Sequence, residues 1–263
     1  LYQFLFLFTF QKSTKMQNKV KQAVILAGGK GERLKPLTNT IPKPMAPING
    51  IPFLDYLVFS IINTGISNIL LLLGYKSDQI IKRYNNISKI NFEFSIGSEK
   101  DKTGRRVLNA FNKLEDHFLL MYGDNYWPIE LNSMCLNYNR LKSPVTTTVF
   151  SNKEGTGEYG FQNNVNVNVD GMVSNYDKKR ETKEANGVDI GYFIISKKTL
   201  NSDIRGNISF EETILPNLIK QNKLGAYMTD EQYYFITNSK TLNNFNNAVK
   251  NNNFLSLPKS YFK

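Results

Sequence analysis

The sequence contains very little cysteine and histidine: its 263 residues include one of each, Cys135 and His117. With a single cysteine no disulfide can form within the chain, and a reducing compartment such as the cytoplasm is expected. Cys135 follows Met134 in a predicted helix, and His117 stands at a predicted helix–strand junction. Both positions are typical of structural residues, so we assign neither of them a catalytic role.

A hydrophobic run long enough to span a membrane is also missing. The first ten residues, LYQFLFLFTF, are mostly apolar, but a membrane-spanning helix needs about 20 such residues. They also lack the basic region and the small-residue cleavage site of a secretory signal. We therefore expect residues 1–15 to be an extension outside the fold, with a short membrane-surface anchor as the alternative, and residues 16–263 to form one domain.

The positive charge of the chain is large but not concentrated. Lys and Arg number 33 against 22 Asp and Glu, which gives a net charge of +11. Most of the positive residues are single lysines, and no dense stripe with interleaved aromatics is present, which argues against nucleic acid as a partner. The excess reflects either a composition biased toward Lys and Asn or an attraction for anionic small molecules. The oligomeric state is left open, a homo-oligomer included.

Apolar runs of strand length alternate with helix-like segments over the first half of the chain. Strands are predicted over 22–27, 68–75, 90–96, 117–124 and 143–150, and helices over 51–65, 77–84 and 104–115. This alternation favours an α/β fold with parallel strands, whose ligands bind at the carboxyl ends of those strands. The glycine-rich turn after Leu26 and the Gly-Asp pair after Tyr122 both fall at that edge.

After residue 150 the pattern changes to short strands and turns. An Asp-Gly pair predicts a hairpin within 158–179, and a strand is predicted over 187–195. A helix over 209–223 begins with the capping box of Ser209 and Glu212. Two short strands, 224–229 and 232–237, and a closing helix over 239–252 complete the prediction.

The stretch AGGKGERLKPLTNTIPKPMAP (27–47) combines a glycine-rich turn with several prolines. Its order does not match the G-x-x-x-x-G-K-[ST] phosphate loop, and Leu34 stands where the third glycine of a G-x-G-x-x-G dinucleotide fingerprint would be. Proline removes a backbone N–H and disfavours helical torsions in the residue before it. Pro42, Pro44 and Pro47 therefore exclude a long helix after the glycines, and with it both helix-based phosphate sites.

A backbone nest fits this stretch better than a helix N-terminus. Successive N–H groups of a turn such as Gly28 to Gly31 can surround an anion. Arg33 and Lys43 then add full positive charges on either side, and an extended proline-rich segment would hold Lys43 in place. We expect the anion to be the triphosphate of a nucleotide.

This stretch resembles the N-terminal motif of the sugar-1-phosphate nucleotidyltransferases, G-x-G-x-R-(x)-P-L-T…P-K-P-M. The resemblance continues through LLMYGDNY, YGF, NYDKK, NGVDIGYFII and SFEETILPNL, covers about residues 20–245, and is strongest to family members with a DNYWP segment. It implies a Rossmann-like, predominantly parallel sheet flanked by helices, with a smaller sugar-binding β lobe. The implied reaction joins an NTP to a hexose or heptose 1-phosphate and gives an NDP-sugar and pyrophosphate, with Mg²⁺ as the cofactor.

The resemblance also assigns roles to residues. Arg33 and Lys43 would act on the nucleotide phosphates in catalysis, and Asp124 would bind the metal, since it ends an apolar strand at the functional edge and Mg²⁺ prefers carboxylates with phosphate oxygens. The nucleotide would contact Leu26, Ala27, Gly28, Gly29, Gly31 and Gly104. The sugar phosphate would contact Lys179 or its neighbour Lys178, and Gly160, Asp189, Gly191 and Glu211.

Two departures from the family pattern stand out. Family members commonly carry a second metal-binding Asp in a segment similar to IDIGTP, whereas residues 233–241 read YYFITNSKT; Asp230, Glu231 or Asp189 could substitute. Without a substitute, either one carboxylate suffices or the chain is impaired, and it could then be a non-catalytic sensor of nucleotide or sugar phosphate. Where the family has small residues, Arg105 and Arg106 stand in KTGRRVL, and they could hold an extra phosphate or face solvent. The nucleobase of the NTP is not identified by these motifs, with a weak preference for guanine.

Overall fold

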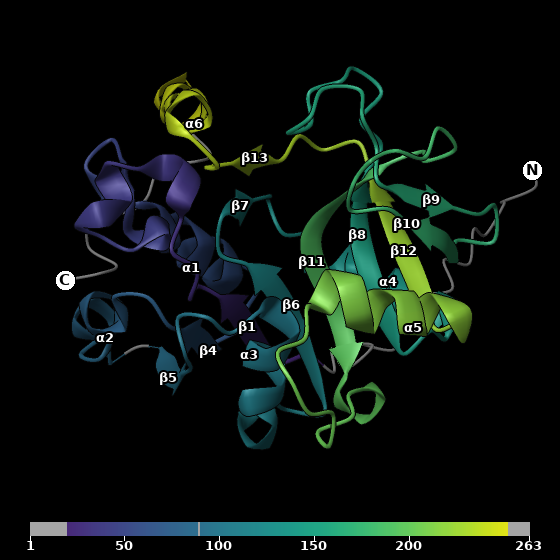
Figure 1. Cartoon of the computed structure of the whole chain (residues 1–263), viewed down its shortest axis with the longest axis horizontal. Coiled ribbons are helices and arrows are strands. Elements are labelled where there is room, and N and C mark those ends of the chain that lie inside the picture. Colours follow the sequence, from purple (N-terminus) through teal and green to yellow (C-terminus); the bar gives the residue numbers. More distant parts are fainter. Residues whose placement is uncertain (1–19, 89, 252–263) are drawn as a thin grey trace, which may run out of the picture.

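The computed structural model describes residues 20–88 and 90–251, so the predicted extension 1–15 lies outside the described residues. A seven-stranded sheet forms the centre of the protein (Figure 1). Its strands, in order across the sheet, are β12 (Leu224–Thr229), β8 (Val145–Phe150), β11 (Val188–Ser196), β6 (His117–Tyr122), β1 (Gln22–Leu26), β4 (Asn68–Leu73) and β5 (Asn91–Ile96).

All strands of this sheet except β11 run in one direction. β1 pairs in parallel with β4 and β6, β4 with β5, and β8 with β12, whereas β11 is antiparallel to both β6 and β8. The predicted α/β fold with a predominantly parallel sheet is therefore confirmed. The direction of β11 matters for the site, because it brings the amino end of β11 to the edge where its neighbours end.

Two hydrophobic layers cover the sheet, because alternate residues of a strand face opposite sides. In β1, Ala23 and Ile25 belong to one buried cluster and Val24 to the other. The first cluster includes residues of α1 (Phe53–Asn63), α2 (Ser77–Tyr84), α4 (Leu131–Leu141) and α6 (Ser239–Asn251). The second includes residues of α3 (Thr103–Asn109), α5 (Leu215–Lys220), β9 (Val165–Val167) and β10 (Val173–Tyr176).

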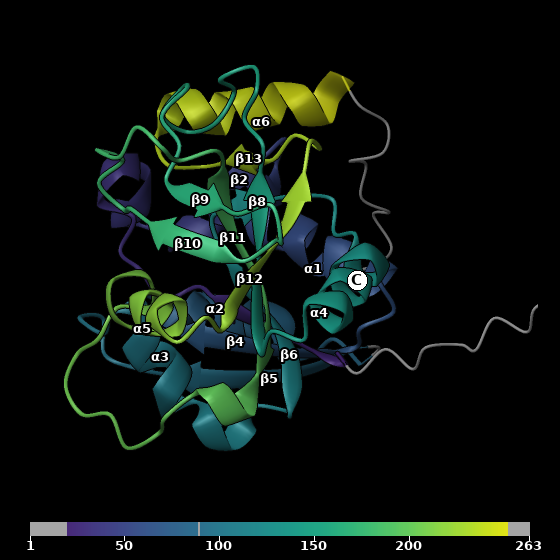
Figure 2. The same ribbon diagram turned by 90° about the vertical axis from the view of Figure 1, so that its right-hand side faces the viewer.

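The smaller lobe is built from the segment between β8 and β11. It contains the predicted hairpin, in which β9 pairs antiparallel with β10, and it lies beside β12 (Figure 2). A second small pair, β7 (Asn125–Tyr126) with β13 (Tyr234–Phe235), joins the turn after β6 to the C-terminal segment. Two distant parts of the sequence therefore meet beside Asp124.

Two predicted helices are shorter than expected. The helix predicted over 104–115 ends at Asn109 and continues only as a 3₁₀ turn, Phe111–Lys113. In the helix predicted over 209–223, the first turn is a π-helix, Phe210–Ile214, and α5 ends at Lys220. Ser209 caps it as predicted, since its Oγ accepts from the N–H of Glu212 at 3.2 Å. No helix among the described residues is both long and apolar enough to cross a membrane.

Candidate active site

The predicted functional edge of the sheet carries a cleft of about 550 Å³. Residues from the glycine-rich turn after β1, the turn after β6, the start of α3 and the smaller lobe line this cleft. Because β11 runs against its neighbours, its residues Val188 and Asp189 pair with Phe150 and Val149 at the end of β8. One cleft therefore collects side chains from both halves of the chain.

In the glycine-rich turn, carbonyl groups accept hydrogen bonds, whereas the N–H groups donate none within the described residues. The carbonyl of Gly28 accepts from the N–H of Tyr75 at 3.1 Å, and the carbonyl of Gly31 accepts from Thr38 Oγ1 at 3.0 Å. Within the described part of the chain, the N–H groups of residues 28–33 donate no hydrogen bond. Successive N–H groups without partners can surround an anion, so the predicted anion nest stays a prediction that this geometry allows.

The prolines after this turn do not produce the extended segment that we predicted. The chain forms three short 3₁₀ turns instead, Glu32–Leu34, Leu37–Asn39 and Lys43–Met45. No long helix follows, as expected for a segment in which proline removes backbone donors. Lys43 packs against Gly31, where an added Cβ would lie 2.8 Å from the Lys43 Cβ, and its Nζ lies 2.6 Å from Asp124 Oδ2.

Asp124 follows β6 after Gly123 and lines the cleft. Burial disfavours its ionised form, but the nearby cations Lys43 and Arg33 outweigh this effect, and the pKa of Asp124 is lowered. Its backbone carbonyl accepts from the N–H of Ile236 at 3.0 Å. The C-terminal segment that lacks the second family carboxylate therefore lies directly beside Asp124.

Arg33 reaches across the cleft to the smaller lobe. Its Nη1 lies 3.4 Å from Glu158 Oε1 and 3.3 Å from the hydroxyl of Tyr159. Glu158 also accepts from Thr237 Oγ1 at 2.7 Å. We predicted neither Glu158 nor Tyr159, although they directly precede Gly160 in the YGF motif, which was the available signal. The two predicted phosphate-binding cations are thus each paired with a carboxylate of the cleft.

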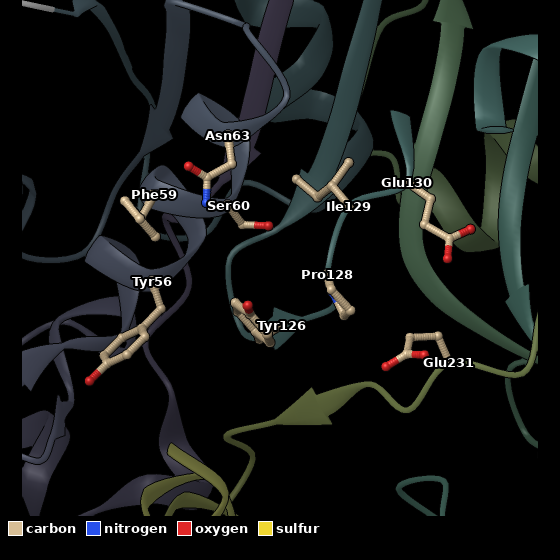
Figure 3. Close-up of a pocket in the computed structure, with 9 residues that line it drawn as sticks. All are labelled: Tyr56, Phe59, Ser60, Asn63, Tyr126, Pro128, Ile129, Glu130 and Glu231. Atoms are coloured by element: carbon tan, nitrogen blue, oxygen red, sulfur yellow. The ribbon is translucent and has the colours of Figure 1, made fainter. Parts of the chain in front are cut away.

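Of the three acids suggested as substitutes for the second family Asp, Asp230 and Glu231 do not line the cleft, whereas Asp189 does. Asp230 pairs with exposed Lys153 at 2.9 Å. Glu231 lines a separate pocket of about 410 Å³ together with Glu130 and residues of α1 (Figure 3). Within residues 20–88 and 90–251, no three His, Cys, Asp or Glu side chains gather in a group that could hold a metal. The carboxylates that pair with Lys43 and Arg33 in the cleft are Asp124 and Glu158.

Two other carboxylates lie on the opposite side of the cleft. Asp189 Oδ1 accepts from Thr147 Oγ1 at 2.7 Å and from the N–H of Gly191 at 3.0 Å. Burial raises the pKa of Asp189 to about 6. Glu211 Oε2 accepts from Thr103 Oγ1 and from Ser209 Oγ, both at 2.7 Å. Each carboxylate is held by hydroxyl donors of the chain itself, a rigid arrangement suited to ordering the hydroxyl groups of a sugar.

Two aromatic hydroxyls that we did not predict lie among these carboxylates. Tyr122, the last residue of β6, and Tyr176, the last residue of β10, both line the cleft. Burial and the neighbouring carboxylates Glu211 and Asp189 raise the pKa of both phenols, so they stay neutral and can donate. Gly191 has φ +78°, and an added Cβ there would lie 2.1 Å from the Tyr122 ring. It positions Tyr122 without lining the cleft.

The sequence could not decide between Lys178 and Lys179, but the structure distinguishes their positions relative to the cleft. Lys178 lines the cleft and lies 3.2 Å from Glu212, whereas Lys179 does not line the cleft but a neighbouring hollow that Lys178 also lines. Arg180 also faces the cleft and lies over the Tyr159 ring at 4.5 Å. The geometry therefore favours Lys178 over Lys179 for an anion in the cleft.

The remaining predicted site residues divide into two groups. Leu26, Ala27, Gly28 and Gly29 line the cleft, as do Asp189 and Glu211. Gly31, Gly104 and Gly160 do not line it. Gly104 is buried in α3, where an added Cβ would lie 3.0 Å from the carbonyl of Ile208, so the absence of a side chain serves packing.

Arg105 and Arg106 both donate to main-chain carbonyl groups. Arg105 donates to the carbonyls of Gly206 at 2.6 Å and Ile204 at 2.7 Å, away from the cleft. Arg106 is 5% exposed and donates to backbone carbonyls behind the glycine-rich turn. The expectation of a solvated pair was wrong for Arg106, because it is buried on main-chain acceptors, and a role of either arginine toward phosphate stays a prediction.

Comparison with known proteins identifies the family of this chain. The model of the family "Nucleotidyl transferase" matches residues 22–241. D-glycero-alpha-D-manno-heptose 1-phosphate guanylyltransferase of Aneurinibacillus thermoaerophilus is 30% identical over 218 residues, which cover 82% of this chain and 91% of that protein. The enzyme of the same name from Campylobacter jejuni is 30% identical over 220 residues, 82% of this chain and 93% of its own. The crystal structure of HddC from Yersinia pseudotuberculosis complexed with GMP-PN matches with a TM-score of 0.72 and 27% identity, covering 87% of this chain and 99% of that one.

Proposed function

We propose that this chain, which belongs to the nucleotidyl transferase family, transfers a guanylyl group from GTP to a heptose 1-phosphate. The class of reaction is that of a sugar-1-phosphate nucleotidyltransferase, which forms an NDP-sugar and pyrophosphate. The observation that carries the proposal is one cleft with two unlike sides. Unused N–H groups, Lys43 and Arg33 lie on one side, and carboxylates held by hydroxyls lie on the other.

The reaction needs positioning and charge neutralisation more than proton transfer. An oxygen of the sugar phosphate attacks the α-phosphorus of the NTP, a new P–O bond forms, and the bond to pyrophosphate breaks. The attacking oxygen is already anionic, so no general base is required. Catalysis then depends on holding the two anions in line and on opposing the charge that they carry. Lys43 and Arg33 are the residues that we assign to this task.

The ion pairs of the cleft suit an exchange of partners on substrate binding. Lys43 is paired with Asp124, and Arg33 with Glu158. A nucleotide accompanied by a divalent cation brings both anionic oxygens and positive charge. Lys43 and Arg33 can then turn to the phosphates, while Asp124 and Glu158 turn to the metal. Each charge finds a new opposite charge, so the exchange costs little electrostatic energy.

Asp124 and Glu158 together fit a magnesium ion. Mg²⁺ is usually held by one or two carboxylates with substrate phosphates and water completing the shell, and these two side chains face the same cleft. When bound, the ion would neutralise the triphosphate and polarise its α-phosphate. Glu158 thereby offers a carboxylate on the side where residues 233–241 supply none, which weakens the case for a non-catalytic sensor.

We assign the other side of the cleft to the sugar phosphate. Lys178 would hold its phosphate, with Arg180 close by, and Asp189 and Glu211 would accept hydrogen bonds from its hydroxyl groups. Neutral Tyr122 and Tyr176 would donate to sugar oxygens. A heptose has one more hydroxyl-bearing carbon than a hexose, and this wall of acceptors and donors is polar enough to bind it.

The choice of guanine rests on the relatives and on one further carboxylate. Asp101 lines the nucleotide end of the cleft, where its Oδ2 accepts from the N–H of Ser98 at 2.9 Å. The Watson–Crick edge of guanine presents two adjacent N–H donors, N1 and N2, which a carboxylate can accept as a pair. Uracil and thymine present one such donor between two acceptors. Asp101 therefore supports guanine.

A matrix of substrates tests the proposal. GTP, CTP, UTP, dTTP and ATP would each be combined with heptose, mannose and glucose 1-phosphates, with pyrophosphate release and the product mass as readouts. We expect the strongest signal for GTP with a heptose 1-phosphate and dependence on Mg²⁺. A strong signal for another pair would reject the proposed substrates, and nucleotide binding without product for every pair would favour the sensor. We also propose a cytoplasmic location, where both substrates are made.

A further inference from the structure

Arg106 is a buried cation attached to three separate segments at the nucleotide end of the cleft. Its Nη1 donates to the carbonyl of Leu73 at 2.8 Å, and its Nη2 donates to the carbonyls of Gly28 at 3.0 Å and Ser98 at 2.9 Å. The carbonyl of Glu99 is a fourth acceptor, at 3.4 Å. These acceptors belong to the ends of β4 and β1 and to the loop after β5.

Burying the Arg106 guanidinium costs free energy, which its hydrogen bonds must offset. A guanidinium that is 5% exposed loses most of its hydration, and a buried charge is stable only when strong hydrogen bonds replace the lost water. No carboxylate lies within ion-pair distance of Arg106 in the described residues. The carbonyl oxygens and the more distant carboxylate of Asp101 offset the charge of Arg106, which lines the cleft.

The backbone around Arg106 is shaped to admit it. An added Cβ at Gly28 would lie 2.3 Å from Arg106 Nη1, and an added Cβ at Gly74 would lie 2.4 Å from the same atom. Real Cβ atoms do not approach other atoms so closely. Arg106 can therefore occupy this place only because glycine stands at both positions, and the three residues form one structural unit.

The contact with Gly28 also fixes the direction of the phosphate-binding donors. In a trans peptide unit the carbonyl and the following N–H point in opposite directions. The carbonyl of Gly28 is held from behind by Arg106 and by the N–H of Tyr75. The N–H of Gly29 then points away from the acceptor side of Arg106, and within the described residues it donates no hydrogen bond, although Gly29 lines the cleft.

We propose that Arg106 is a positioning residue for the nucleotide: it holds the glycine-rich turn, the end of β4 and the loop after β5 in one arrangement and adds positive charge beneath the bound phosphates. The inference rests on nucleotide binding in the proposed function but not on the choice of base or sugar. It assigns to Arg106 a role on the nucleotide side alone. Its loss should therefore affect nucleotide affinity and leave the sugar phosphate unaffected.

The test compares Arg106→Ala with Arg105→Ala, a matched control. Both variants lose a guanidinium that donates to carbonyls, but Arg105 acts outside the cleft. We expect Arg106→Ala to raise the KM for GTP about tenfold to hundredfold, the range for losing hydrogen bonds of a charged group. The KM for the sugar phosphate should stay constant, and guanidinium ions well below denaturing concentration should restore part of the GTP affinity. Arg105→Ala should keep the KM for GTP.

Two further measurements keep the inference open to refutation. Should Arg106→Ala not fold, Arg106→Lys keeps the charge with fewer donors, and calorimetric titration with GTP should show weaker binding than in the wild-type protein. Unchanged GTP affinity in the folded variants, even with a lowered melting temperature, would overturn the inference. If the wild-type protein binds GTP but turns over no substrate pair, the proposed function fails while the titrations still decide the role of Arg106.

Discussion

The two sides of the cleft are built in different ways. The nucleotide side comes largely from one continuous stretch, residues 26–45, whose glycines and prolines set its backbone and whose Arg33 and Lys43 supply its charge. The sugar side is assembled from β6, β10, the amino end of β11 and the turn before α5. Triphosphate recognition needs clustered N–H groups and cations, which a short segment can provide, whereas a sugar must be surrounded. Local backbone pattern therefore indicates the first side, whereas the residues of the second side were predicted only from the resemblance to the family.

The largest effect is expected on the nucleotide side, from Lys43→Ala. Removing a cation aimed at charge in the transition state typically lowers kcat about 100- to 1,000-fold. Pyrophosphate release measures the loss, and circular dichroism checks that the fold is intact. Lys35→Ala is the control, because Lys35 is exposed and pairs only with Glu32. Near wild-type turnover by the Lys43 variant would refute its assignment to the phosphates.

The next largest effect is expected on the sugar side, where Lys178→Ala is compared with Lys179→Ala. Lys178→Ala is expected to raise the KM for the sugar phosphate about tenfold to hundredfold, as a charged hydrogen bond is lost. Lys179→Ala should leave it unchanged, since Lys179 does not line the cleft. Steady-state kinetics with varied sugar phosphate at saturating NTP separates the two. The reverse result would show that the NYDKK segment turns on binding, and would return the role to Lys179.

Glu158→Gln tests the residue that joins the two lobes. The substitution keeps an oxygen for Thr237 but removes the charge, and we expect the Mg²⁺ concentration for half-maximal rate to rise about tenfold. Mn²⁺ binding in the presence of NTP, followed by electron paramagnetic resonance, gives a readout that does not depend on turnover. Glu231→Gln is the control, because Glu231 lines the separate pocket of Figure 3. Equal metal affinity in wild type and Glu158→Gln would exclude Glu158 as a ligand.

The smallest effect is a change in stability at Asp189. Its pKa is about 6 in the folded protein because of burial, above the ordinary value of about 3.9. The folded state therefore binds the proton more tightly, and stability falls as the pH rises from about 4 through 6. Asp189→Asn should raise the free energy of unfolding at pH 7 by about 1–3 kcal/mol and leave it unchanged near pH 3. Urea unfolding at both pH values measures this.

The same variant should bind the sugar phosphate less well, since a neutral amide is a weaker acceptor than a carboxylate. Stability and substrate binding would then change in opposite directions at one position, which is typical of functional residues. A variant that is both less stable at pH 7 and unimpaired in its KM for the sugar phosphate would contradict this account of Asp189.

Most of the fold was predictable, and the misses have local causes. The alternation of apolar runs and helical segments gave the α/β class, and the helix predicted over 77–84 matches α2. The helices predicted over 104–115 and 209–223 were too long, because apolar periodicity continues through 3₁₀ and π turns. The direction of β11 could not be predicted, since an antiparallel and a parallel strand bury the same apolar residues.

The sequence by itself excluded a long helix after the glycine-rich turn, because proline acts through local backbone geometry, and it placed Arg33 and Lys43 in the stretch that we propose binds the nucleotide. Only the tertiary structure decided which of two adjacent lysines faces the cleft, that Glu158 meets Arg33, and that Arg106 is buried on carbonyl groups. Each of these depends on a contact between segments far apart in the chain. Arg105 and Arg106 illustrate the reason: they are adjacent in the sequence, but the carbonyl groups to which they donate belong to different segments that only folding brings together.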